Sequence, residues 1–167
     1  MTKTEEGLKE AFAGESQANR MYTAFAKKAD EEGFPQVAKL FRAAAEAETV
    51  HALNHLRVMG QVKSTADNLG TAISGETYEF KKMYPEFIEA AKKDQNKKAE
   101  LSFEYANKVE QIHAALYQKA LDALKSKKEP AKADYYVCPV CGNTFEGTAP
   151  DVCPICATPK AKFKKIE

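Results

Sequence analysis

The fold is decided by residues 103–124, FEYANKVEQIHAALYQKALDAL, which carry a regular stripe at helical spacing. The stripe residues recur in steps of three and four, and they are Phe103, Ala106, Glu110, His113, Tyr117, Ala120 and Leu124. Glu110 and His113 occupy stripe positions where a simple helical bundle would have leucine. The stretch therefore predicts a core helix with a polar site on its inward face.

The whole of residues 1–127 has the composition of a helical domain. It is rich in Ala, Glu, Lys and Leu, and proline occurs there only at positions 35 and 85. The periodic pattern predicts four amphipathic helices at about 4–32, 35–60, 67–94 and 95–126, with a polar loop at 61–68. Pro35 suits the first turn of the second helix. Pro85 falls inside the third helix, where we expect it to kink the helix or remove a backbone hydrogen bond.

Two of these helices contain Glu-x-x-His, as ETVH at 48–51 and as EQIH at 110–113. A spacing of three places both side chains on one helical face, where they can bind neighbouring positions of one metal centre. A single pair would be a weak signal. Two pairs on inward-facing stripes are much more specific, and they use two of the three histidines in the chain.

The helical domain also repeats itself. AGES at 13–16 resembles SGET at 74–77, 61 residues later, and RMY at 20–22 is echoed by KMY at 82–84. The two helix pairs therefore look like two copies of one unit. Two equivalent half-sites follow: Glu15, Glu48 and His51 in the first copy, and Glu76, Glu110 and His113 in the second. One Glu from each of two helices and Glu-x-x-His from each of the other two is the ligand arrangement of di-iron bundles.

Glu79 lies three residues after Glu76, on the same helical face, and has no counterpart in the first copy. With the four glutamates of the half-sites it makes five carboxylates. In a bundle core these would repel one another and lose hydration, so without cations several would have to protonate. The pattern therefore indicates two bound cations, and carboxylates with imidazoles suit iron or manganese better than copper.

A charged linker at 128–134 leads to a different composition at 135–167, which holds all four cysteines. They form two Cys-x-x-Cys pairs, Cys138 with Cys141 and Cys153 with Cys156. This pattern is typical of a tetrahedral metal site, which fits both zinc and iron. A module of this size cannot fold on a hydrophobic core alone, so we expect a metal to stabilise it.

Composition argues against several classes of partner. The net charge is +1 and no basic stripe with interleaved aromatics occurs, so we expect no nucleic-acid partner. The chain has no run of 18 apolar residues and no apolar segment near its N-terminus. We therefore expect neither a membrane partner nor a secretory signal. The expected location is cytoplasmic, where clustered cysteines bind metal in preference to forming disulfides.

Glu15, ETVH, GETYE, EQIH and the four cysteines together resemble the rubrerythrin family over essentially the whole chain. The resemblance implies an all-α ferritin-like four-helix bundle with a non-haem di-iron site at 1–127. A small rubredoxin-like β module with one Fe bound by the four cysteines is implied at 135–167, so iron is favoured over zinc. A homodimer is also implied. In one departure, Ala157 stands where rubredoxin-like modules usually carry glycine; if its φ is positive, the cost is on the order of 1 kcal/mol.

The resemblance also guides the roles of the ligands. Glu48 and Glu110 are predicted to bridge the two irons. Glu15 and Glu76 are predicted to be terminal ligands, one for each iron, and His113 to bind one iron constantly.

His51 and Glu79 are the predicted catalytic residues. In the family, the equivalent iron is bound by the histidine when reduced and by the extra glutamate when oxidised. Carried over to this chain, His51 would serve the ferrous state and Glu79 the ferric state. A hard anion suits the more highly charged ion.

The family's activity is that of a peroxidase, which reduces hydrogen peroxide to water. Electrons would enter through the rubredoxin-like iron, ultimately from NAD(P)H through separate reductases or a rubredoxin. Two alternatives stand beside this prediction. The first is a ferritin-like ferroxidase or iron-handling protein, which the appended electron carrier disfavours. The second is a metal-stabilised helical scaffold with a zinc ribbon.

Overall fold

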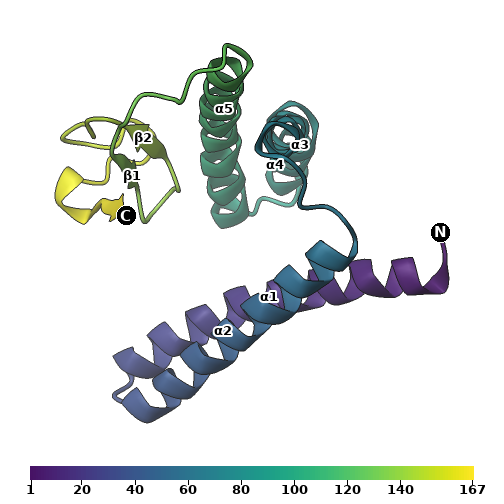
Figure 1. Cartoon of the computed structure of the whole chain (residues 1–167). Coiled ribbons are helices and arrows are strands. Elements are labelled where there is room, and N and C mark those ends of the chain that lie inside the picture. The colour runs from purple at the N-terminus through teal and green to yellow at the C-terminus, as the bar shows by residue number, and fades with distance from the viewer. The chain divides into compact units, whose positions relative to one another are not determined.

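The computed structural model describes residues 1–167, which divide into two compact units, 1–63 and 64–167. The first unit is a helical hairpin of α1 (Lys3–Glu31) and α2 (Pro35–Val58), which run side by side (Figure 1). The turn between them contains Gly33 with φ +80°, a conformation that glycine adopts without strain. Pro35 occupies the first turn of α2, as predicted.

Small residues line the interface of this hairpin. The buried apolar side chains of the first unit are all alanines: Ala26, Ala29, Ala38, Ala45 and Ala52. The buried Asn19 links the two helices, because its amide nitrogen donates to Ala45 O at 2.6 Å and to Thr49 Oγ1 at 2.7 Å. These contacts fix the register of α1 against α2.

The second unit contains another helical hairpin. Its first arm consists of α3 (Thr65–Tyr78), a π-helix η1 (Glu79–Met83) and α4 (Tyr84–Lys93), and its second arm is α5 (Lys97–Lys125). Ser64 caps α3 by accepting a hydrogen bond from Asp67 N, so the polar loop ends earlier than the predicted 61–68. The sequence predicted one helix over 67–94 with a kink at Pro85. The structure has a π-helix in this arm, between α3 and α4 and just before Pro85.

The two hairpins repeat one another in detail. In each, three aromatic rings pack together: Tyr22, Phe25 and Phe41 in the first, and Tyr84, Phe87 and Phe103 in the second. The closest pair of ring centroids is 5.5 Å apart in both triads. Gln95, with φ +54°, stands in the second inter-helix turn where the first has Gly33.

The C-terminal module is a three-stranded antiparallel sheet of order β2-β1-β3, formed by β1 (Tyr135–Val137), β2 (Thr144–Glu146) and β3 (Lys164–Ile166). A short 3-10 helix, η2 (Lys160–Lys162), precedes β3. The buried residues of the module are Cys138, Asn143, Ala149, Cys153 and Thr158. This set lacks large apolar side chains, which agrees with a module that needs a metal for stability.

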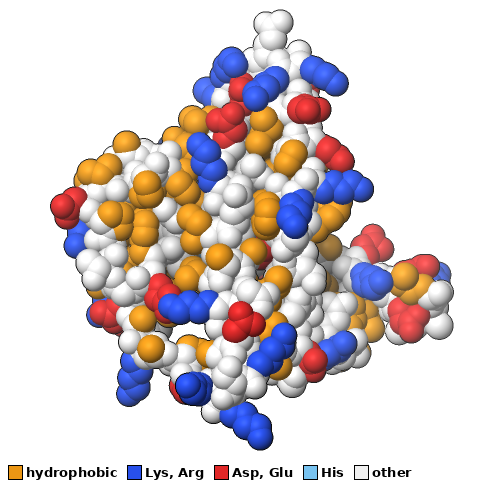
Figure 2. Space-filling model, turned by 90° about the horizontal axis from the view of Figure 1, so that it is seen from above, with side chains coloured by type: hydrophobic (Ala, Val, Ile, Leu, Met, Phe, Trp, Pro, Cys, Tyr) orange, Lys and Arg blue, Asp and Glu red, His pale blue; other side chains and the backbone are white.

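No helix is long and apolar enough to cross a membrane. On the face drawn in Figure 2, Lys and Arg side chains are interspersed with Asp and Glu. This mixed surface agrees with the net charge of +1.

Candidate metal sites

The first cluster of predicted ligands lies within the α1–α2 hairpin. Glu15 comes from α1, and Glu48 and His51 come from successive turns of α2. His51 Nδ1 lies 2.8 Å from Glu48 Oε2 and 3.9 Å from Glu15 Oε1. One ligand atom from each residue lies within 4.8 Å of the others, so the three side chains converge.

The second cluster has the same geometry in the second unit. Glu76 comes from α3, and Glu110 and His113 come from α5. His113 Nδ1 lies 2.8 Å from Glu110 Oε2 and 3.9 Å from Glu76 Oε1. The structure thus brings together both predicted groups of three, and Nδ1 is in each case the ring nitrogen that faces the carboxylates. Two carboxylates and one imidazole form a donor set that fits iron or manganese.

Glu79 stands outside the second cluster of three but close enough to interact with it. Burial raises the pKa of Glu79, the negative charge of Glu76 raises it further, and His113 opposes the shift. Glu79 begins the π-helix, and its carbonyl accepts the hydrogen bond of Tyr84 N, five residues later.

This π-turn explains an irregularity in the repeat. Glu15 and Glu76 are 61 residues apart, whereas Tyr22 and Tyr84 are 62 apart. The second copy therefore holds one extra residue between Glu76 and Tyr84. A single-residue insertion is accommodated in a helix as one wide π-turn, and such turns are frequent at functional sites.

Acidic groups of the second cluster hold protons more tightly than usual. Burial raises the pKa of Glu76, and the neighbouring Glu110 raises it further. Burial also raises the pKa of Tyr84 and Tyr117, with the same carboxylates contributing. Tyr117 was not predicted as a site residue, although it lies on the inward stripe with Glu110 and His113. Without cations, the cluster is therefore short of positive charge.

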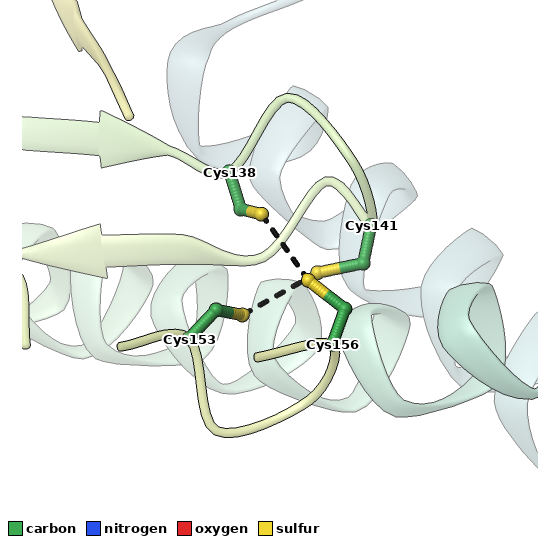
Figure 3. Close-up of side chains that lie close together, drawn as sticks. All are labelled: Cys138, Cys141, Cys153 and Cys156. Atoms are coloured by element: carbon green, nitrogen blue, oxygen red, sulfur yellow. Dashed lines mark hydrogen bonds between the residues drawn. The ribbon is translucent and has the colours of Figure 1, made fainter. Parts of the chain in front are cut away.

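The four cysteine side chains point toward one another from two loops (Figure 3). Cys138 Sγ and Cys156 Sγ are 3.5 Å apart, and Cys141 Sγ and Cys153 Sγ are 3.6 Å apart. These separations are far longer than a disulfide bond of about 2.05 Å. They are close to the edge of about 3.8 Å of a tetrahedron with metal–sulfur bonds of about 2.3 Å. The cysteines are free and arranged for one tetrahedral metal ion, and we call this cluster the four-cysteine site.

The two cysteine loops repeat the same backbone hydrogen bonds. Gly142 N donates to Cys138 O and Ala157 N donates to Cys153 O, both at 2.9 Å. Gly142 has φ +81° and Ala157 has φ +59°. Ala157 therefore has the positive φ on which the expected strain depends.

Hydrogen-bond donors lower the pKa of Cys138 and Cys153, whereas burial and the neighbouring thiols raise the pKa of Cys141. Burial of Cys138 opposes ionisation. The backbone N–H groups of Cys141 and Val140, with the side chains of Cys156 and Thr158, outweigh it and lower the pKa of Cys138 to about 6. The amide nitrogen of buried Asn143 lies 3.8 Å from Cys153 Sγ. Such contacts prepare Cys138 and Cys153 for a metal, because only the thiolate binds it.

Comparison with known proteins supports these sites. Residues 6–121 match the rubrerythrin family model, and residues 136–164 match the model of the rubrerythrin, rubredoxin-like domain. The chain belongs to the rubrerythrin family. It is 38% identical over 175 residues to Rubrerythrin-2 of Clostridium acetobutylicum, an alignment covering 96% of this chain and 95% of that protein.

Nigerythrin is a second similar member of the rubrerythrin family. Nigerythrin of Nitratidesulfovibrio vulgaris is 38% identical, with 96% of this chain and 85% of the relative covered. Solved structures of nigerythrin in its mixed-valence and fully reduced, all-ferrous states match with TM-scores of 0.58 and 0.59. Their identities are 36% and 35%, and both cover 99% of this chain and 88% of the other.

Membership of the rubrerythrin family confirms the fold class, a helical ferritin-like part followed by a rubredoxin-like module. The cofactors are a non-haem di-iron site and one iron in the four-cysteine site. Rubrerythrins are iron-dependent oxidoreductases. The ligand role of each residue, and the boundaries at 127 and 135, stay predictions.

Proposed function

We propose that this chain is a non-haem di-iron peroxidase that reduces hydrogen peroxide to water. Each turnover consumes two electrons and two protons and yields two water molecules. Electrons would enter through the iron of the four-cysteine site, supplied from NAD(P)H by a separate reductase or a rubredoxin. The observation that carries this proposal is the presence in one chain of two matching Glu/Glu/His clusters and a four-cysteine site.

The proposed ligand roles are those that membership of the rubrerythrin family implies, and the convergence of the side chains in each cluster is compatible with them. When bound, the iron pair supplies the two electrons. Glu48 and Glu110 each lie 2.8 Å from the histidine of their own cluster, and we assign them as bridging carboxylates. Glu15 and Glu76 lie further from the histidines and serve as terminal ligands.

Glu79 and His51 are assigned to the ligand exchange between redox states. Glu79 lies outside the converged group of three, so its carboxylate can stand aside in one state and bind in the other. His51 is the more exposed of the two cluster histidines, with 54% of its side chain exposed against 25% for His113. His113 is assigned as the constant ligand.

A comparison of steady-state and single-turnover rates tests the function. The iron-loaded protein, with a reductase, rubredoxin and NADH, should consume two electrons for each hydrogen peroxide. Cys138→Ser removes one sulfur from the electron-transfer iron, so it should slow steady-state turnover at least tenfold. The same variant, reduced chemically beforehand, should still oxidise at nearly the wild-type rate in one turnover.

Two results would contradict the proposal. One is a wild-type protein that oxidises iron once and then accumulates it as a mineral, which is the behaviour of a ferroxidase. The other is a Cys138→Ser variant with unchanged steady-state turnover, because electrons would then bypass the four-cysteine site.

A further inference from the structure

Two polar side chains are buried in the C-terminal module, Asn143 and Thr158, which are 1% and 6% exposed. Each stands two residues after the second cysteine of its loop. Cys138 N donates to Asn143 O at 2.9 Å, and Cys153 N donates to Thr158 O at 2.8 Å. The two cysteine loops therefore hold a buried polar residue at the same position, but the residue type differs.

The first cysteine of each loop has the same kinds of hydrogen-bond partner. Besides the other sulfurs, its Sγ contacts two backbone N–H groups of its own loop and one side chain of the opposite loop. The sets are Val140, Cys141 and Thr158 for Cys138, and Ile155, Cys156 and Asn143 for Cys153. The backbone donors come with the turn of the loop. The side-chain partners depend on residue type, so they are the place where the sequence can adjust the site.

The contact of Asn143 with Cys153 has only one possible direction. Asn143 Nδ2 lies 3.8 Å from Cys153 Sγ, and an amide nitrogen carries two hydrogens and cannot accept. The side chain therefore donates to the sulfur. Thr158 differs, because its Oγ1 lies 3.1 Å from Cys156 Sγ and a hydroxyl can either donate or accept. Asn143 is thus the buried side chain that can only supply a hydrogen to the four-cysteine site.

The other end of the same amide is unfavourable for folding. Asn143 Oδ1 is buried and has no hydrogen-bond partner in the protein, which costs about 1–3 kcal/mol. A leucine has the same branched shape and no polar atom, so it would fill this position without that cost. Packing alone therefore does not account for asparagine here, whereas a hydrogen bond to the sulfur of a redox metal site does.

Charge determines which redox state this hydrogen bond favours. The ferrous site carries one more negative charge than the ferric site, because the iron gains an electron and the four thiolates stay unchanged. A donor to a thiolate sulfur therefore stabilises the ferrous site more than the ferric site. Hydrogen bonds to the sulfurs are among the factors that set the reduction potentials of iron–sulfur sites.

We propose that the side-chain amide of Asn143, acting through Cys153, raises the reduction potential of the iron in the four-cysteine site. The step that it adjusts is the addition of one electron from an external donor, which converts Fe(III) to Fe(II) without breaking a bond or carrying a proton. The higher potential makes this iron easier to reduce. The inference rests on the proposed function only for the destination of the electron, the di-iron site.

Two apolar substitutions at position 143 test the proposal in the full-length, iron-loaded protein. Reductive titration with redox dyes, followed by the ferric absorption of the four-cysteine site, measures the reduction potential. Asn143→Leu keeps the branched shape, Asn143→Val is smaller, and both remove the donor. In both, the equilibrium constant for reduction should fall about threefold to tenfold, which is about 30–60 mV for one electron. Val152→Thr is the control, because Val152 adjoins Cys153 but is 52% exposed, and it should leave the potential unchanged.

Several results would overturn this role of Asn143. One is a potential that is unchanged or higher in the two apolar variants while the ferric absorption shows bound iron. Another is an equal fall in Val152→Thr, and a third is loss of the iron from both apolar variants, which would make Asn143 a structural residue only. The potential is measured without peroxide. A wild-type protein without peroxidase activity whose Asn143 variants still show the lower potential therefore overturns the proposed function alone.

Discussion

At the scale of single residues, Ala157 has a backbone conformation that favours glycine. Its φ is +59° and its side chain is exposed, so the Cβ adds strain without burying apolar surface. We predict that Ala157→Gly stabilises the C-terminal module by about 0.5–1 kcal/mol, because relief of the strain exceeds the extra freedom of glycine in the unfolded chain. Loss of the ferric absorption of the four-cysteine site on heating measures the change.

Gly142 supplies the matched control in the other cysteine loop. It has φ +81°, and an added Cβ would meet Val109 at an ordinary contact distance of 3.9 Å. Gly142→Ala should therefore lose about 1 kcal/mol through strain alone. If Ala157→Gly and Gly142→Ala shift the thermal midpoint of the ferric absorption in the same direction, backbone strain does not govern the stability of these loops.

Residue types and spacing were enough to predict the members of both clusters of three and the four cysteines. The fixed helical period places Glu-x-x-His on one face, and the repeat identifies the matching glutamates. Asn143 could not be found in this way. Its contact with Cys153 depends on how the two cysteine loops face one another, ten residues apart in sequence, and no local pattern specifies that arrangement.

At the scale of elements, the π-helix at Glu79–Met83 absorbs the extra residue of the second repeat. Deleting Lys81 should restore a continuous α-helix. The spacing between Glu76 and Tyr84 would then equal the spacing between Glu15 and Tyr22 in the first repeat. Pro85 would then fall inside an α-helix, at a cost of about 3 kcal/mol. The deletion is therefore combined with Pro85→Thr, the residue at the equivalent position 23. We predict a free energy of unfolding within about 1–2 kcal/mol of wild type.

Deletion of Lys108 is the control for this element. Lys108 is also an exposed lysine, but it lies in the regular helix α5 between Phe103 and Glu110. Removing it rotates one end of α5 by about 100° relative to the other. The loss should exceed about 4 kcal/mol in urea unfolding followed by circular dichroism. Equal losses in the two deletions would show that the π-turn does not absorb an insertion.

The main helices were predictable because their caps and stripes are local signals. The hairpin turns at Gly33 and Gln95, the first turn at Pro35 and the ends of α5 follow from such signals. The π-helix was missed because Glu76, Glu79 and Pro85 are compatible with a kinked α-helix. The change of repeat offset from 61 to 62 residues was visible in the sequence, and it marks the insertion.

At the scale of the whole molecule, the metal-free protein carries unbalanced acidic groups. In the second unit, Glu76, Glu79 and Glu110 gather around one histidine, His113, and the pKa of Glu76 and of Glu79 is raised, first by burial and then by neighbouring carboxylates. Iron would neutralise this charge. Removal of the iron should therefore make the free energy of unfolding of the helical part depend on pH.

The sign follows from the direction of these pKa shifts. Below the ordinary carboxyl value of 4.5, Glu76 and Glu79 are protonated whether the chain is folded or unfolded. As the pH rises, the unfolded chain loses these protons first, because the folded protein holds them to higher pH. Unfolding then releases protons, so the free energy of unfolding falls until the pH passes the raised values.

We therefore predict that chelator-treated protein becomes less stable as the pH rises from about 4.5 to about 7. Urea unfolding followed by circular dichroism measures this decline in stability.

Replacing both residues, Glu76→Gln and Glu79→Gln, should remove most of the decline. The difference between wild type and this variant also cancels the separate titration of Cys138. Iron-loaded wild type should show the reverse trend, because Fe(II) competes with protons for the carboxylates. A metal-free protein that gains stability over this range, by more than the Gln variant does, would contradict the raised pKa values.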